Sequence, residues 1–173
     1  MTMLAALVLS LLAQEASKPL TEYRFGCHSN ATDAQLAALR KYPELRTIDV
    51  LSDKITDAGL EALKDFPKLE VLKINSSTIT DKGLEHVAAM PGLKELVLFR
   101  CKVTAEGLAR LKKLSALRTL ALWRIPVTAE VVAELKELKN LESLSFGQLT
   151  PESREKAAEL VALLPSTKFS ISR

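Results

Sequence analysis

The sequence contains few of the residues from which catalytic and metal-binding sites are built. Its 173 residues include two histidines, two cysteines, six glycines and 5% aromatic residues. His28 and His86 lie far apart, and no CxxC or HxxxH spacing accompanies them. The strings GxSxG, GxGxxG and GxxxxGKS/T are also missing, so nucleophile-elbow, dinucleotide and P-loop chemistry have no support. We therefore expect no enzyme, no metal site and no cofactor.

Charge of one sign is not in clear excess. Twenty-four Lys and Arg residues stand against 21 Asp and Glu residues, and the net charge of +3 is scattered along the chain. Because a nucleic-acid-binding domain usually carries a clustered basic patch, we expect no nucleic-acid partner. With 47% hydrophobic residues, the chain has the composition of one folded domain rather than of a disordered segment.

A long hydrophobic run is also missing. The longest extends from Leu4 to Ala13, interrupted by Ser10, whereas a helix needs about 20 apolar residues to cross a bilayer. This length is typical of a signal peptide, with Ala13 at a cleavage position, although no Lys or Arg precedes the run. We expect residues 1–19 to be a signal peptide and short linker of an exported, periplasmic or secreted protein, with no stable membrane insertion of the mature chain. The alternative is a buried cap helix on a cytoplasmic protein.

The sequence after this segment repeats a similar pattern at a fixed period. Five segments begin at Leu45, Leu69, Leu93, Leu117 and Leu141, so successive starts are 24 residues apart. Each opens on Leu-x-x-Leu-x-Leu or a close equivalent, in which the fourth and sixth residues point to one face of a strand. The predicted inward pairs are Ile48 and Val50, Leu72 and Ile74, Leu96 and Leu98, Leu120 and Leu122, and Leu144 and Phe146.

A helix is predicted in the second part of each unit. The predicted helix starts are Thr56, Thr80, Thr104, Thr128 and Thr150. A Thr hydroxyl there can accept a hydrogen bond from an amide of the first turn, and apolar residues four and seven positions after the first four threonines form a buried helix face. The stretch from Leu20 repeats the pattern with one extra residue, and Ser166–Ser172 predicts a last strand. We expect about seven parallel strands in residues 20–173, with atypical end units covering the core.

The segments ITDAGLEALKDFPKLEVLKI and VTAEGLARLKKLSALRTLAL carry a resemblance to leucine-rich repeats. They are similar to the cysteine-containing subtype, F-box-associated or ribonuclease-inhibitor-like, with 24-residue units. Cys101 occupies the cysteine position of that subtype, whereas the equivalent residues in other units are Asp53, Ser77 and Ile125. The resemblance covers the chain from Leu20 onward. It implies an α/β fold: a right-handed solenoid of about six strand-helix units and a closing strand, with the parallel sheet on the concave face and the helices on the convex face.

The cysteines are not expected to form a disulfide. Cys27 and Cys101 lie about three units apart in the predicted stack, and a strand spacing of about 4.8 Å separates them by about 15 Å.

The concave face supplies the candidate binding residues. With the fourth and sixth residues inward, the third, fifth, seventh and eighth residues of each unit should face outward. Residues at the same position of successive units form a column across the sheet. Phe99 and Trp123 are then neighbours in the column of seventh residues, flanked by Arg100 and Arg124 of the eighth. Small residues at Thr119, Ala121 and Ser145 leave room for a partner. The fifth column adds Asp49, Lys73 and Val97. The alternative is that the two aromatic rings only pack on each other and on the following loop.

The hypothesis that follows is a non-catalytic, monomeric scaffold that binds a protein partner on its concave face. The resemblance also allows the substrate-recognition part of a ubiquitin-ligase adaptor, although no F-box-like segment precedes the repeats. A structural or surface spacer remains open, and so does an enzyme with a concave carboxylate such as Asp49. Fold alone does not decide among these functions.

Overall fold

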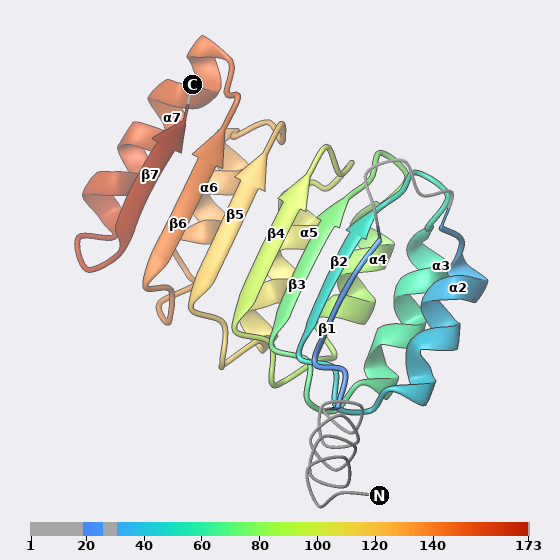
Figure 1. Ribbon diagram of the computed structural model, residues 1–173. Coiled ribbons are helices and arrows are strands. Elements are labelled where there is room, and N and C mark those ends of the chain that lie inside the picture. Colours follow the sequence, from blue (N-terminus) through green and yellow to red (C-terminus); the bar gives the residue numbers. More distant parts are fainter. Residues whose placement is uncertain (1–18, 26–30, 173) are drawn as a thin grey trace, which may run out of the picture.

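The structure is a computed structural model in which residues 19–25 and 31–172 are described (Figure 1). The expected signal peptide lies almost wholly outside these residues, as do Cys27 and His28. Within the described part of the chain, none of the helices combines the length and apolar character needed to cross a membrane.

Seven parallel strands form one sheet in chain order. They are β1 (Glu22–Arg24), β2 (Thr47–Leu51), β3 (Val71–Asn75), β4 (Glu95–Phe99), β5 (Thr119–Trp123), β6 (Ser143–Gly147) and β7 (Lys168–Ser172). From β2 to β6 each residue pairs with the residue 24 positions later, as Ile48 does with Leu72. The sequence period is therefore the register of the sheet.

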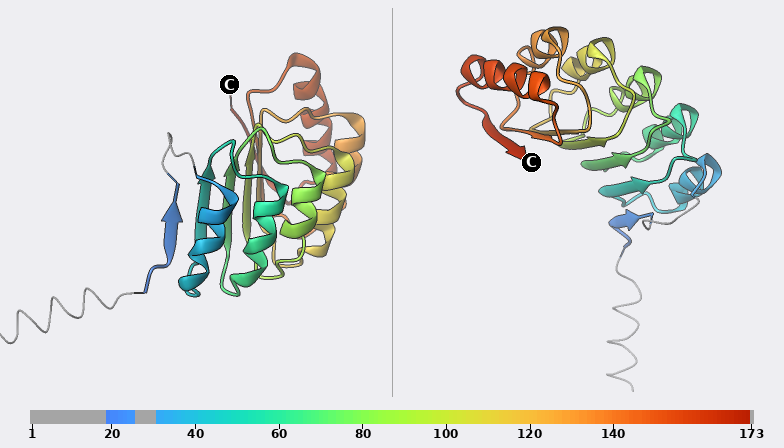
Figure 2. Two further views of the ribbon diagram at one scale, coloured as in Figure 1. Left: turned by 90° about the vertical axis from the view of Figure 1, so that its right-hand side faces the viewer. Right: turned by 90° about the horizontal axis from the view of Figure 1, so that it is seen from above.

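One helical segment follows each of the first six strands and returns the chain to the start of the next strand. The α-helices are α2 (Asp33–Ala38), α3 (Asp57–Leu60), α4 (Asp81–Val87), α5 (Ala105–Ala109), α6 (Ala129–Leu135) and α7 (Pro151–Leu163). Three continue as 3-10 turns: η1 (Leu39–Lys41), η2 (Glu61–Asp65) and η3 (Arg110–Lys113). Figure 2 shows an arch with the strands on its inner side and the helices on its outer side. This confirms the predicted α/β solenoid.

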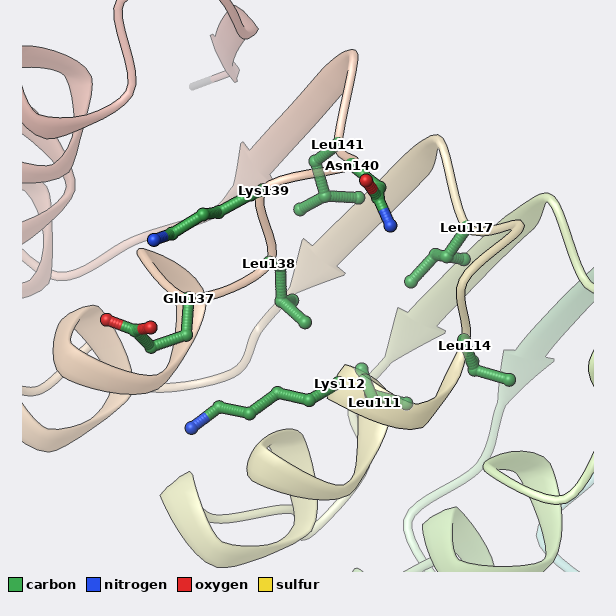
Figure 3. Close-up of a pocket in the computed structure, with 9 residues that line it drawn as sticks. All are labelled: Leu111, Lys112, Leu114, Leu117, Glu137, Leu138, Lys139, Asn140 and Leu141. Atoms are coloured by element: carbon green, nitrogen blue, oxygen red, sulfur yellow. The ribbon is translucent and has the colours of Figure 1, made fainter.

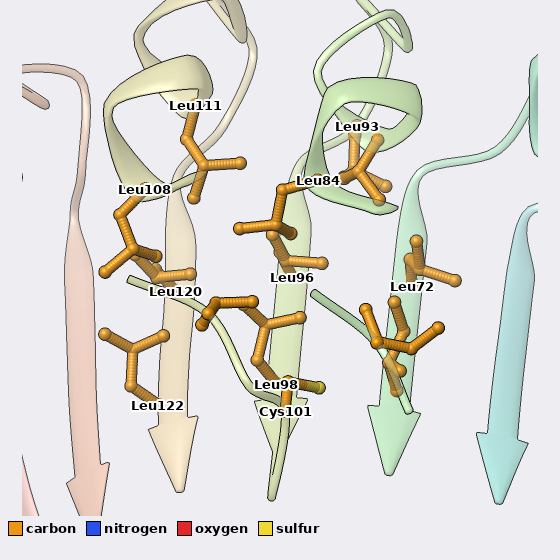
Figure 4. Close-up of a cluster of buried hydrophobic side chains, with 14 of the residues drawn as sticks. Leu72, Leu84, Leu93, Leu96, Leu98, Cys101, Leu108, Leu111, Leu120 and Leu122 are labelled. Carbon is orange, nitrogen blue, oxygen red and sulfur yellow. The ribbon is translucent and has the colours of Figure 1, made fainter. Parts of the chain in front are cut away.

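The core lies between the sheet and the helices. All five predicted inward pairs are buried, with exposed fractions of at most 1%. Figure 4 shows Leu96 and Leu98 of β4 beside Leu120 and Leu122 of β5, beneath leucines from α4 and α5, with Cys101 at the end of the cluster. Because every unit contributes the same inward positions, one apolar layer runs through the stack.

The thiol of Cys101 belongs to this layer. The cysteine is free, and burial raises its pKa to about 11. Its Sγ lies 3.6 Å from the carbonyl oxygen of Phe99, across the turn that follows β4. Because the side chain is buried, it points inward at the strand end.

Hydrogen bonds at the helix starts differ in detail from the prediction. The hydroxyl oxygens of Thr80, Thr104, Thr128 and Thr150 accept from backbone amides of their helices, as expected. Thr56 accepts no such bond. Its hydroxyl and its amide instead donate to the carboxylate of Asp33 in the preceding unit, at 2.7 and 2.8 Å.

A carboxylate ladder links successive helix starts. Asp57 accepts the same two bonds from Thr80, and Asp81 accepts them from Thr104. Asp57 and Asp81 lie in the first turn of their helices, where a carboxylate complements the helix dipole. In the structure they also bond the next unit, so the Thr-Asp sequence joins neighbouring repeats through charge-assisted hydrogen bonds.

Glycine makes room for this ladder. A Cβ atom added to Gly59 or Gly107 would lie 2.1 Å from a carboxylate oxygen of Asp33 or Asp81, respectively. In one unit, Ala105 occupies the position of the aspartate. In the unit that follows it, the position of the glycine is occupied by Val131, which is buried. Aspartate and glycine therefore occur together because the carboxylate occupies the space that a side chain would need.

The last unit covers the core less completely than expected. Phe169 and Ile171 of β7 occupy the inward register positions beside Leu144 and Phe146. Phe169 is only partly buried, and Ile171 is 38% exposed, because β7 is an edge strand of the described sheet. The prediction that the closing strand covers the core is therefore only partly right.

Candidate binding face on the concave side

The outward residues of the strands form the concave face, and most of them are half-buried. This holds for Asp49, Lys73 and Val97 of the fifth column and for Phe99 and Trp123 of the seventh. Ala121 departs from the expectation, since it is only 7% exposed. The space expected above this alanine is therefore closed by its neighbours.

A charged hollow of about 450 Å³ occupies the amino-terminal half of this face. It is lined by Glu22, Tyr23, Arg24, Thr47, Asp49, Val71, Lys73 and Glu95. Arg24 Nε lies 2.9 Å from Asp49 Oδ2, and Lys73 Nζ lies 3.5 Å from Glu95 Oε1. The predicted residues Asp49 and Lys73 are thus both present here, but each already has an oppositely charged partner.

An aromatic pair occupies the carboxyl ends of β4 and β5. The ring centroids of Phe99 and Trp123 lie 6.4 Å apart, and the rings are stacked at 25°. The indole also extends over β6, because a Cβ atom added to Gly147 would lie 2.2 Å from Trp123 Cε3. Part of the alternative interpretation is therefore right: the rings pack on each other and on the next strand. Both residues nevertheless keep a solvent-facing part on the concave face.

The two flanking arginines have different surroundings. Arg100 Nη2 reaches back to Asp53 Oδ2 at 3.0 Å, and the amide of Ser77 also donates to this carboxylate. The hydrogen bond from the Ser77 amide is the main cause that lowers the pKa of Asp53, and Arg100 lowers it further. Arg124 instead lies with its guanidinium 5.7 Å from the centre of the Phe99 ring, and its Nε donates to Oε1 of Gln148.

The eighth residues of the units do not all point to the same side of the sheet. Ser52 and Ser76 were expected on the concave face but are buried, with hydroxyls that donate to the carbonyls of Ala31 and Ile55. Arg100, Arg124 and Gln148 at the same position are exposed. The prediction is thus wrong for the first two units and right for the last three.

Backbone conformation explains this split. Arg100, Arg124 and Gln148 have φ values of 61°, 55° and 54°, in the left-handed region that non-glycine residues seldom adopt. This turn directs the eighth residue outward and the ninth inward, so that Cys101 and Ile125 are buried. The sequence does contain a signal for it, because the ninth residue is polar in the units of Ser52 and Ser76 and apolar in the later ones.

Other hollows lie away from the concave face. A cavity of about 40 Å³ lies between η3 and the turn before β6, lined by residues including Leu111, Leu138 and Leu141 (Figure 3). A groove of about 540 Å³ runs between α2 and α3, with Arg40 and Asp65 paired at 2.6 Å on its lining. The small cavity has space for little more than water. In the described residues, no three His, Cys, Asp or Glu side chains are placed to hold a metal ion.

Comparison with known proteins supports leucine-rich repeats. A family model described as "Leucine Rich repeat" matches residues 67–88, which contain β3 and α4. No curated protein sequence matches the chain.

A solved structure with the same fold matches the chain at low sequence identity. The leiomodin-1 actin-binding site 2 is 18% identical over 79% of this chain and 91% of that chain, with a TM-score of 0.57. An internalin (inlF) from Listeria monocytogenes is 17% identical over 79% of this chain, with a TM-score of 0.48, and the match spans only 45% of the internalin chain.

Proposed function

We propose that this chain, an α/β solenoid of leucine-rich repeats, is a non-catalytic scaffold that binds a protein partner on its concave face. The single observation that carries the proposal is the arrangement of Phe99, Trp123 and Arg124. Aromatic and arginine side chains dominate the energetics of protein interfaces, above all when they are held in position before binding. Here the rings are stacked, and the guanidinium is held by a ring face and by Gln148.

The name of one matched structure agrees with such a role without defining it. It is the actin-binding site 2 of leiomodin-1, and the proposal takes from it only that this fold can present a protein-binding surface.

Two further proposals concern the whole chain. We infer that residues 1–19 are a signal peptide and linker of an exported protein, on the basis of the apolar run from Leu4 to Ala13. Mass spectrometry of the protein from its native source should find a mature chain that lacks this run, and an intact amino terminus would contradict export. We also propose that the repeats are of the cysteine-containing subtype. The proposal rests on the 24-residue register and on the buried Cys101 at the cysteine position, although the other units carry other residues there.

Trp123→Ala tests the proposed binding face. The variant should fold and lose about 1–2 kcal/mol of stability, because a stacked, half-exposed ring is removed. Affinity capture from the native source, with wild-type and variant chains as baits, should show proteins that the wild type retains and the variant loses. Circular dichroism and thermal unfolding of both baits check that the fold is kept.

Tyr42→Ala is a matched control. Tyr42 is also a partly buried aromatic residue with a cation on its ring, since Lys41 Nζ lies 5.0 Å from the ring centre, but it lies outside the concave strands. This variant should capture the same proteins as the wild type. A capture profile that Trp123→Ala leaves unchanged, or that both variants change alike, would contradict the proposal.

A further inference from the structure

The two halves of the concave face differ in their acidic residues. The outward positions of β1–β4 include Glu22, Asp49 and Glu95. Strands β5, β6 and β7 contain no Asp or Glu, and their outward residues include the hydroxyls of Thr119, Ser143, Ser145 and Ser170 together with Lys168. The carboxyl-terminal half of the face thus offers hydrogen-bonding groups and positive charge without a carboxylate to balance them.

Arg124 is exceptional among the described arginines. Six others pair with carboxylates: Arg24, Arg40, Arg46, Arg100, Arg110 and Arg118. Arg124 and Arg154 have no carboxylate within salt-bridge distance among the described residues. Of these two, only Arg124 lies beside the concave face, at the end of β5.

The guanidinium of Arg124 is ordered without being neutralised. Its Nε donates to Gln148, and its centre lies over the Phe99 ring. These two neutral groups together fix the position of the side chain. Its two terminal nitrogens have no hydrogen-bond partner in the described part of the chain. An arginine presents donors that suit both oxygens of one carboxylate, so this side chain is arranged to receive an external anion.

We infer that the partner is an acidic protein segment, which lies across β4–β7 and places a carboxylate on Arg124 beside an apolar side chain on Trp123. This inference rests on the proposed function and specifies the partner's chemistry. The negative charge of the segment complements the positive charge of this half of the face. The outward hydroxyls of β5–β7 can also hydrogen-bond the backbone of an extended segment. The charged hollow over β1–β4 does not share the property, because Lys73 and Arg24 already face carboxylates.

A peptide selection tests this inference. The immobilised full chain is exposed to a random peptide library displayed on phage, and enriched peptides are synthesised and titrated by fluorescence anisotropy. The enriched sequences should carry Asp or Glu near a large apolar side chain. Arg124→Gln should weaken their binding about tenfold or more, and higher salt should weaken it further. Arg124→Glu should abolish it.

The chain itself supplies suitable controls. Gln148 already has a positive φ of 54°, so Arg124→Gln introduces a residue type that this turn accommodates. Arg154→Gln removes the other arginine without a carboxylate partner, on α7, and should leave the affinity unchanged. Thermal unfolding of each variant shows that its fold is retained.

The outcomes separate the two proposals. If the selected peptides lack acidic residues, or bind Arg124→Gln as tightly as the wild type, the acidic partner is wrong even where binding still depends on Trp123. Binding that is independent of Trp123 as well overturns the binding face itself. Phosphatidylserine vesicles and single-stranded DNA are tested in parallel, and Arg124-dependent binding to either, without peptide binding, also overturns the inference.

Discussion

Phe146→Ala should lower the free energy of unfolding by about 3–5 kcal/mol, which is the usual cost of emptying a large apolar site in a packed core. Phe146 is fully buried on the inner side of β6. Its register neighbours are Leu122 on β5 and Ile171 on β7. Because repeats contact mainly their neighbours, the loss should be greatest in the last units. Urea denaturation measures the total, and amide hydrogen exchange should show β6 and β7 losing protection before β2 and β3.

Two controls bracket this effect. Phe146→Leu keeps most of the volume and should cost less than about 1.5 kcal/mol. Leu163→Ala removes an apolar side chain from the same end of the solenoid, but this residue is 54% exposed, so the cost should be below about 1 kcal/mol. Equal costs for Phe146→Ala and Leu163→Ala would show that the inward register does not determine stability. Since Gly147 follows Phe146 and supports Trp123, loss of order in β6 should also weaken partner binding.

Gly107→Ala should destabilise the protein by about 2–4 kcal/mol, although Gly to Ala within a helix is ordinarily favourable. The added Cβ would lie 2.1 Å from Asp81 Oδ1 and would displace the carboxylate that accepts two hydrogen bonds from Thr104. In the Asp81→Ala background the same change should become neutral or stabilising by up to about 1 kcal/mol. The double-mutant cycle, measured by urea denaturation, reports this change of sign.

Gly92→Ala serves as the matched glycine control. A Cβ atom there would meet its nearest neighbour, the Leu69 carbonyl oxygen, at an ordinary 3.6 Å, and no described glycine has a positive φ. Its effect should stay within about 0.5 kcal/mol. Gly107→Ala could also prove equally destabilising with and without Asp81. That result would contradict the explanation that glycine occurs in the Thr-Asp-x-Gly pattern because it leaves space for a carboxylate.

The fold could be predicted from the sequence because the determining information is periodic. A spacing of 24 residues between Leu45, Leu69, Leu93 and Leu117 leaves one register in which all inward pairs stack. A shift by one residue would turn every such pair toward solvent, so the hydrophobic effect selects this register strongly. The same alternation placed Phe99 and Trp123 correctly as outward neighbours on adjacent strands.

Tertiary structure decided which candidate side chains are buried and which are paired with an opposite charge, because burial and pairing depend on contacts between units. Asp53 and Arg100 are 47 residues apart, and only the stacked turns bring them together, so Arg100 is neutralised while Arg124 is not. The buried direction of Ser52 and Ser76 follows from a turn conformation that strand alternation does not encode, although the polar ninth residue of their units is a sequence signal for it. Sequence alone determined the strands, the inward residues and the face. Only the assembled solenoid determined which charges on that face remain available, since electrostatic pairing depends on distances of a few ångströms between different repeats.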